Sequence, residues 1–167
     1  RPSNYGYIDK TGKIVIEPQF DFSQDFCNGF AQVYDRTSEL YGFINRKGDL
    51  VIPYQFKEVE NFSENGLAAV RLDDKWGYID TTGKFVIEPK FQYAGSFRNG
   101  LAQVKVIIND EKWECIDTTG KTVPAPDCYA CRYFENGFAT FHKNGKVGII
   151  DTTGKIIIEP KYDDIYW

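Results

Sequence analysis

The sequence predicts an all-β protein made of tandem repeats of about 35 residues, each a three-strand antiparallel meander. Three observations support this fold class. One string recurs along the chain, as in YGYIDKTGKIVIEPQF (5–20) and WGYIDTTGKFVIEPKF (76–91). Aromatic residues make up 16% of the chain, which is typical of strands. Turn signals separate short apolar runs, and helical periodicity is absent.

The copies are expected to stack, because one meander cannot bury its aromatic face alone. The predicted arrangement is an open curved or superhelical array. The alternative is a closed ring like a β-propeller, in which strands from both termini complete one split blade. Five turn hairpins but only four Asn-Gly strands are present, and both ends of the chain carry the hairpin. Neither end therefore supplies what the other lacks, which favours the open array.

The spacing of the turn glycines defines the copies. The steps between these glycines are 36, 35, 37 and 34 residues, at Gly12, Gly48, Gly83, Gly120 and Gly154. In each of the first four copies, the first aromatic residue and a later phenylalanine are 21 residues apart, as from Trp76 to Phe97. We expect a single array over residues 1–167, with copies 1 to 4 at 5–40, 41–75, 76–112 and 113–146 and a partial copy 5 at 147–167.

Each copy opens with a predicted hairpin. The turn Asp80-Thr81-Thr82-Gly83 has the residues of a type I turn followed by a left-handed residue, because Asp accepts hydrogen bonds from nearby amides and Gly tolerates positive φ. The flanking runs GYI and FVI are short and rich in strand formers. Gly77 leaves a bare backbone on which a neighbouring ring can lie.

A third strand is predicted after a second turn signal. This signal is an Asn-Gly pair, found at 28–29, 65–66, 99–100 and 136–137. Each pair precedes an alternating run such as Leu101-Ala102-Gln103-Val104. We expect a longer linker around Pro18, Pro89 and Pro160, and polar tips of variable length between the copies.

The strings WGYIDTTGKFVIEPKF and NGLAQV resemble the WG repeat of bacterial proteins, and the resemblance covers residues 5 to about 162. It implies a tandem β architecture and a role in binding other macromolecules, and it implies no catalytic residue. Several positions depart from the pattern: Tyr5 and Tyr41 replace Trp, Val147 starts the last copy, Glu114 replaces Gly, and Pro53-Tyr54 replaces Glu-Pro. Copy 4 is the most altered.

Composition excludes some function classes. The net charge of −4 gives no basic footprint for nucleic acid. No apolar run of about eighteen residues occurs, so no transmembrane segment is expected. The chain lacks Met and opens directly on a repeat, which indicates a processed or trimmed piece. The residues leave the compartment undecided, with an extracytoplasmic or cell-surface location in a bacterium as the favoured expectation.

Copy 4 concentrates the soft ligands Cys115, Cys128, Cys131 and His142. Three interpretations stay open: small apolar replacements in core positions, a disulfide involving Cys128, and a zinc site. Core packing is favoured, because Cys115 occupies the position of Tyr78 in copy 3. We expect no metal and no cofactor, and a free thiol at Cys27.

Enzymatic chemistry is not expected. The turn carboxylates are one per copy, at Asp9, Asp80, Asp117 and Asp151, so they offer too few oxygens for calcium and are explained by turn formation. His142 is the single histidine, is predicted to be exposed, and has no evident nucleophile as a partner.

The sequence favours a non-enzymatic scaffold that binds another protein, either through the variable tips or by pairing at its end strands. The predicted contact residues in the tips are Arg36, Glu39, Asp73, Asp74, Asn109, Glu111, His142 and Lys143. The alternative is a carbohydrate-binding β module in which Trp76, Trp113 and Trp167 are stacking platforms.

Overall fold

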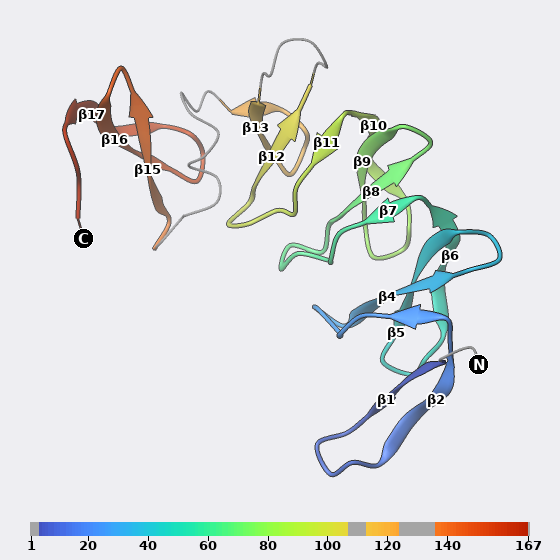
Figure 1. Ribbon diagram of the computed structural model, residues 1–167. Helices are drawn as coiled ribbons and strands as arrows, with labels where there is room; N and C mark the ends of the chain where they lie inside the picture. The colour runs from blue at the N-terminus through green and yellow to red at the C-terminus, as the bar shows by residue number, and fades with distance from the viewer. Residues whose placement is uncertain (1–3, 107–112, 124–135, 167) are drawn as a thin grey trace. The chain divides into compact units, whose positions relative to one another are not determined.

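The protein is described by a computed structural model over residues 4–106, 113–123 and 136–166 (Figure 1). The predictions for Asn109, Glu111, Cys128, Cys131 and Trp167 lie outside these residues. All regular elements of the described part are β-strands, which confirms the all-β prediction. Within that part, no helix is long and apolar enough to cross a membrane.

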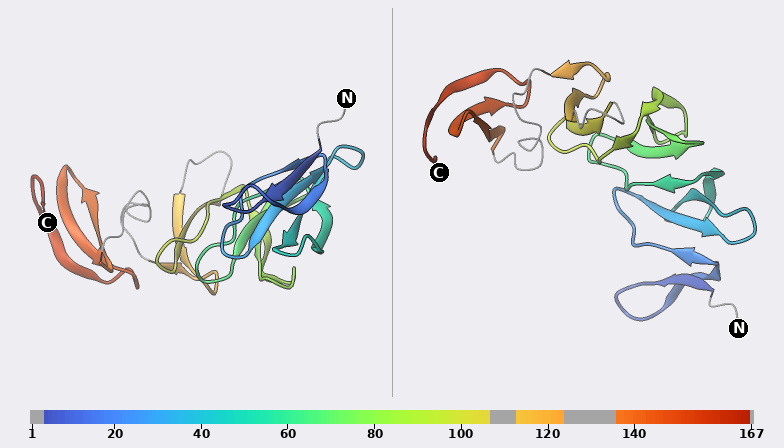
Figure 2. Two further views of the ribbon diagram at one scale, coloured as in Figure 1. Left: turned by 90° about the horizontal axis from the view of Figure 1, so that it is seen from below. Right: turned by 45° about the horizontal axis from the view of Figure 1, so that its top comes forward.

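The chain divides into two compact units, Arg1–Pro89 and Lys90–Trp167. The expectation of a single array over the whole chain stays a prediction. The first compact unit contains three small sheets with strand orders β1-β2, β3-β4-β5-β6 and β7-β8-β9-β10, the last of which ends just past the boundary (Figures 1 and 2). The strands are β1 (Tyr5–Ile8), β2 (Ile14–Phe20), β3 (Phe22–Ser23), β4 (Phe30–Asp35), β5 (Leu40–Asn45), β6 (Leu50–Phe56), β7 (Glu58–Val59), β8 (Ala68–Leu72), β9 (Lys75–Ile79) and β10 (Phe85–Phe91).

The second compact unit contains two described sheets, with strand orders β11-β12-β13-β14 and β15-β16-β17. Its strands are β11 (Tyr93–Ala94), β12 (Leu101–Lys105), β13 (Trp113–Asp117), β14 (Thr122–Val123), β15 (Phe138–Lys143), β16 (Lys146–Asp151) and β17 (Ile156–Tyr162). Strands that follow one another in the sequence are neighbours in each sheet, which confirms the antiparallel meander. None of the described sheets closes into a barrel.

The hydrogen-bonded sheet is offset from the sequence repeat. The sheet β3-β4-β5-β6 takes β3 and β4 from the end of copy 1 and the hairpin β5-β6 from the start of copy 2. The next sheet joins copies 2 and 3 in the same way. Successive copies are therefore joined by strand pairing as well as by side-chain packing.

The predicted linker around the prolines is wrong, because these residues lie inside strands. Pro18 is within β2, Pro89 within β10 and Pro160 within β17. These strands are at the edges of their sheets, where a residue without an N–H costs no ladder hydrogen bond. The register also shifts in the hairpins β1-β2, β5-β6 and β16-β17, so that the proline strand wraps around its partner.

The Asp-x-x-Gly turns form as predicted. In copy 3, Gly83 N–H donates to the Asp80 carbonyl at 3.0 Å, and Gly83 has φ of +84°. The Asp80 carboxylate accepts hydrogen bonds from the Thr82 hydroxyl at 2.6 Å, from Thr82 N–H at 2.8 Å and from Lys84 N–H at 3.1 Å. Asn45 has the same role in copy 2, where its side-chain oxygen accepts from Lys47 N–H. The turn is thus specified by local hydrogen bonds to the side chain of its first residue.

These turns make stability depend on pH. The Thr82 hydroxyl, followed by the Thr82 backbone N–H, holds the pKa of Asp80 below its ordinary value. A lowered pKa means that the charged form stabilises the fold above the ordinary Asp range, and that this stabilisation is lost as pH falls through the folded-state pKa. We expect Asp80→Asn to be less stable than the wild type at pH 7, with a smaller difference near pH 3. Urea unfolding at both pH values measures this, and an equal difference at both would contradict it.

The first compact unit has an interior shared between copies. Phe43, Ile52 and Phe56 of copy 2 form one buried cluster with Ala68, Val70 and Ile79 of the next sheet. A Cβ on Gly48 would lie 3.0 Å from the Ile16 side chain, and a Cβ on Gly83 would lie 3.4 Å from the Ile52 side chain. The turn glycine of each of these copies therefore rests on the isoleucine of the preceding copy, as stacking requires.

Candidate functional site

Polar side chains connect the first two sheets that follow the N-terminal hairpin. The Asn28 side-chain amide donates to the Phe62 carbonyl at 2.7 Å, and Gln32 Nε2 donates to Asn61 Oδ1 at 2.9 Å. Gln32 is only 4% exposed, so this bond satisfies an amide that is buried in the interior. We call these contacts the polar seam. Its role is structural, because each donor already has a partner from the neighbouring sheet.

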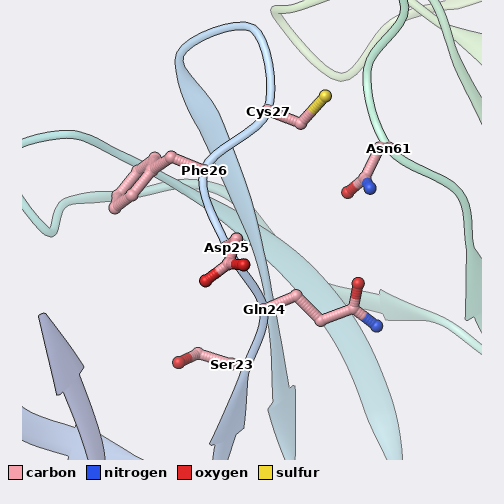
Figure 3. A pocket seen from close by; sticks show the side chains of 6 residues that line it. All are labelled: Ser23, Gln24, Asp25, Phe26, Cys27 and Asn61. Carbon is pink, nitrogen blue, oxygen red and sulfur yellow. The ribbon is translucent and has the colours of Figure 1, made fainter.

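An open pocket of about 580 Å³ borders the polar seam (Figure 3). It is lined by Ser23, Gln24, Asp25, Phe26, Cys27 and Asn61. The side chains of Gln24 and Asn61 lie on the same side of the segment 23–27. The Phe26 ring lies on its other side (Figure 3). Phe26 packs against Tyr7, with ring centroids 4.6 Å apart, and the Arg46 guanidinium lies over the Phe26 ring, with Cζ 5.4 Å from the ring centre. The pocket offers amide groups and one carboxylate.

Cys27 at the rim of this pocket is a free thiol, as predicted. Its Sγ lies 3.6 Å from the Phe62 carbonyl, which accepts a weak hydrogen bond from it. Among the described residues, no group of three or more His, Cys, Asp or Glu side chains is arranged to hold a metal ion.

Cys115 is buried in β13, at 1% exposure, and is disulfide-bonded. It packs with Leu101, Val123 and Trp113. Cys115 thus lies in a core position, as the favoured interpretation expects, but it is disulfide-bonded and not an unpaired apolar replacement. The parts of those interpretations that concern Cys128 and Cys131 lie outside the described residues.

The six described residues of the predicted contact set are all exposed and lie at the ends of three hairpins. Arg36 and Glu39 lie between β4 and β5, Asp73 and Asp74 between β8 and β9, and His142 and Lys143 at the end of β15. Asp74 is already part of an ion-pair cluster: Arg71 lies 3.5 Å and Lys57 3.6 Å from its carboxylate. Arg71 also pairs with Glu58. Whether these tips bind a partner stays a prediction.

The tryptophans are poorly placed as sugar platforms. Trp76 is 5% exposed, in the core of the first compact unit. Trp113 is half-buried, packs edge-on against Tyr93 and has the Lys105 ammonium 6.0 Å from its ring centre. Trp76 thus has no accessible face for stacking on a pyranose, whereas the Trp113 ring is only partly covered by Tyr93 and Lys105.

A row of exposed valines was not singled out from the sequence. Val15, Val51 and Val86 are 54%, 37% and 47% exposed, and each precedes a buried isoleucine on the edge strands β2, β6 and β10. These valines occupy the same position in three consecutive copies of the first compact unit. We call them the valine row. The signal in the sequence is the repeated pattern Lys-x-Val-Ile-Glu, seen at 13–17 and 84–88.

The repeats of this chain match a known family of proteins. The family model described as WG containing repeat matches residues 5–35, 41–76, 76–113, 115–146 and 148–166. Among solved structures, one titled "Crystal structure of the eukaryotic initiation factor" is similar over 74% of this chain and 36% of that chain, with 15% identity and a TM-score of 0.42. The comparison with curated proteins found no match.

Proposed function

Because the chain belongs to the WG containing repeat family, we propose that it is a non-enzymatic scaffold whose stacked copies present a surface to another protein. Repeat architectures of this kind expose more surface than their own cores require, and they use it for binding. The stacking contacts of the first compact unit support this proposal, since they hold equivalent residues of successive copies at fixed spacing.

The observation that carries the proposal is the valine row. Valine favours strands, so a single exposed valine needs no explanation. Three exposed valines stand at the same position of consecutive copies, and exposed charged residues flank them in the sequence at Lys13, Glu17, Lys84 and Glu88. An apolar centre with a polar rim is the usual composition of a protein-binding surface. The packing of Ile16, Ile52 and Ile87 on the other side shows that the core does not need these valines.

Affinity capture from the native organism tests whether the valine row binds a partner protein. The wild-type chain is expected to retain a stoichiometric protein partner. The triple variant Val15→Thr, Val51→Thr, Val86→Thr keeps the β-branched shape and strand propensity but removes apolar surface, so retention should fall roughly tenfold or more. Thermal unfolding of the variant checks that its fold is kept.

Two controls sharpen this experiment. Ile157→Thr removes the equivalent exposed residue of β17 and should retain the partner. Arg36→Ala with Asp73→Asn tests the tips, and loss of the partner in this variant alone would move the binding surface from the valine row to the tips. Equal retention by the wild type and the valine variant, or no stoichiometric partner at all, would contradict the proposal.

The carbohydrate-binding alternative has less support from the described residues. That alternative needs accessible aromatic faces, and Trp76 is buried while Trp113 is covered on one side by Tyr93 and Lys105.

A further inference from the structure

Asn-Gly pairs are places where an asparagine can react with its own backbone. The backbone nitrogen of a following glycine is not hindered by a side chain, so it can attack the side-chain carbonyl carbon of the asparagine. The reaction requires these two groups to approach each other, and a fold that holds either group in place slows it. Five such pairs occur in the chain, and they begin at Asn28, Asn65, Asn99, Asn136 and Asn144.

The Asn28 side chain is held by the neighbouring sheet. Its amide nitrogen donates to the Phe62 carbonyl at 2.7 Å, as part of the polar seam. Two backbone hydrogen bonds between Cys27 and Phe30, at 2.8 and 3.1 Å, close the turn around it. The side chain must leave Phe62 before the Gly29 nitrogen can reach its carbonyl carbon, so this pair is protected.

The pair Asn65-Gly66 is held in a different way. The Gly66 N–H donates to the Ser63 carbonyl at 2.9 Å, and the Asn65 side-chain oxygen accepts from the Ser63 hydroxyl. A Cβ on Gly66 would lie 3.7 Å from the Thr81 side chain, so copy 3 also packs close to this turn. Both reacting groups already have partners, and the attacking nitrogen is directed toward Ser63 instead of the Asn65 side chain.

The pair Asn144-Gly145 is the exposed two-residue loop between β15 and β16. Asn144 has φ of 53° and Gly145 has φ of 74°, as a tight hairpin turn requires. A Cβ on Gly145 would have no atom within 4 Å. Within the described part of the chain, neither the Asn144 side chain nor the Gly145 N–H has a hydrogen-bond partner.

The two residues that close this loop weaken it. Lys143 and Lys146 stand directly opposite each other, and like charges in such a pair are destabilising. Lys146 is ion-paired with Asp163, whereas Lys143 has no ion-pair partner among the residues that the structure describes. We therefore expect this loop to open locally more readily than the turns at Asn28 and Asn65.

We propose that Asn144 is a site of spontaneous modification, at which the side-chain amide is converted to an aspartate or isoaspartate carboxylate. The Gly145 backbone nitrogen forms a bond to Asn144 Cγ and loses its proton, the Cγ–Nδ2 bond breaks, and Nδ2 leaves as ammonia. A water molecule then opens the resulting succinimide ring at either of its two carbonyl groups. Water is the co-reactant, and the reaction transfers no electrons.

The modified tip differs from the original in charge and in backbone. Conversion adds a carboxylate to a tip whose other ionisable side chains are His142, Lys143 and Lys146. An isoaspartate also adds a carbon to the main chain of a two-residue loop, which disturbs the closing pair. His142 and Lys143 belong to the predicted contact set, so ageing of the chain would alter one of its candidate binding surfaces. The modification itself does not depend on the proposed function.

Site-resolved conversion rates test this proposal. The intact chain is incubated at mildly alkaline pH, and peptide mapping by mass spectrometry follows each asparagine. In the folded chain, Asn144 should convert roughly tenfold faster than Asn28 and Asn65, whose hydrogen bonds must break first. The same chain unfolded in urea is the matched control: each of the three asparagines precedes a glycine there, so their rates should agree within about threefold.

The variant Lys143→Glu tests the role of the closing pair. It places opposite charges across the loop, so the folded-to-unfolded rate ratio at Asn144 should fall roughly twofold to fivefold, while the ratio at Asn28 stays the same. Equal rates at Asn144, Asn28 and Asn65 in the folded chain would overturn the proposal. So would an Asn144 that stays unconverted while the unfolded chain reacts. An unchanged ratio in Lys143→Glu would refute opening of the closing pair as the cause.

Discussion

Gly77→Ala is expected to lower the free energy of unfolding by about 3 kcal/mol, which corresponds to a fall in melting temperature of roughly 10 °C or more. A Cβ at this position would lie 2.6 Å from the Ile87 carbonyl oxygen, 2.8 Å from Pro89 N and 3.0 Å from the Glu88 carbonyl carbon. All three are backbone atoms of the paired strand, so they cannot move aside as the end of a flexible side chain could. The strand pairing of β9 with β10 must open to admit one methyl group.

The matched control for this prediction is Gly95→Ala. Gly95 is not among the residues with positive φ, and a Cβ there would come no closer than 3.5 Å to the Gln103 carbonyl oxygen. Its substitution should therefore change stability by less than about 0.5 kcal/mol. Urea unfolding of the two variants gives the comparison. A Gly77→Ala variant no less stable than Gly95→Ala would show that the hairpin does not wrap its glycine as tightly as the structure indicates.

The same close approach explains why glycine recurs at this position. A Cβ on Gly6, Gly42 or Gly148 would lie 2.5 to 2.6 Å from the carbonyl of the facing isoleucine. The sequence predicted that a ring would lie on this glycine, and the Phe141 ring does approach Gly148. In the other copies the constraint comes from the register shift of the proline strand. In copy 4, Glu114 replaces the glycine, and the second strand of the hairpin, β14, pairs with β13 over only Thr122 and Val123 among the described residues.

Local chemistry made much of the fold predictable. The Asp-x-x-Gly and Asn-Gly turns are specified by residues close in sequence, and Asn28 and Gly29 both have positive φ, as a two-residue hairpin of this type requires. The offset of the sheets from the repeat was not predictable from local pattern, because strand pairing across a copy boundary leaves no local signal. The prolines were misread as a linker since the pattern does not show which strands lie at sheet edges.

The candidate surfaces were predictable in part for similar reasons. The tips were found because length varies there, and the six described residues of the predicted set are exposed. The polar seam was missed because the position of Gln32 holds Ala69 in copy 2 and the position of Asn61 holds Asp25 in copy 1, so no pattern shared by all copies indicates this pair. Ile8 reads in the sequence as one more core isoleucine. Only its neighbours in space show that it is exposed where its equivalents are buried.

Phe62→Ala is expected to cost about 4 kcal/mol, the largest effect of any single substitution argued for this chain. Phe62 is 1% exposed, and its ring lies 4.7 Å from that of Phe30 and 4.9 Å from that of Phe43, centre to centre. Phe30 belongs to copy 1, whereas Phe43 and Phe62 belong to copy 2, so truncation removes the ring that joins them. The cavity would lie in the cluster that includes Ile52, Phe56 and Val70.

Phe138→Ala is the matched control, because Phe138 is 41% exposed and its truncation should cost less than about 1 kcal/mol. Chemical unfolding measures both variants against the wild type. The Phe62 variant keeps the backbone carbonyl that accepts from Asn28, so its loss of stability reports ring packing rather than the polar seam. If both phenylalanine variants were equally stable, the copies would not share one interior. The fixed spacing on which the valine row depends would then lack its physical basis.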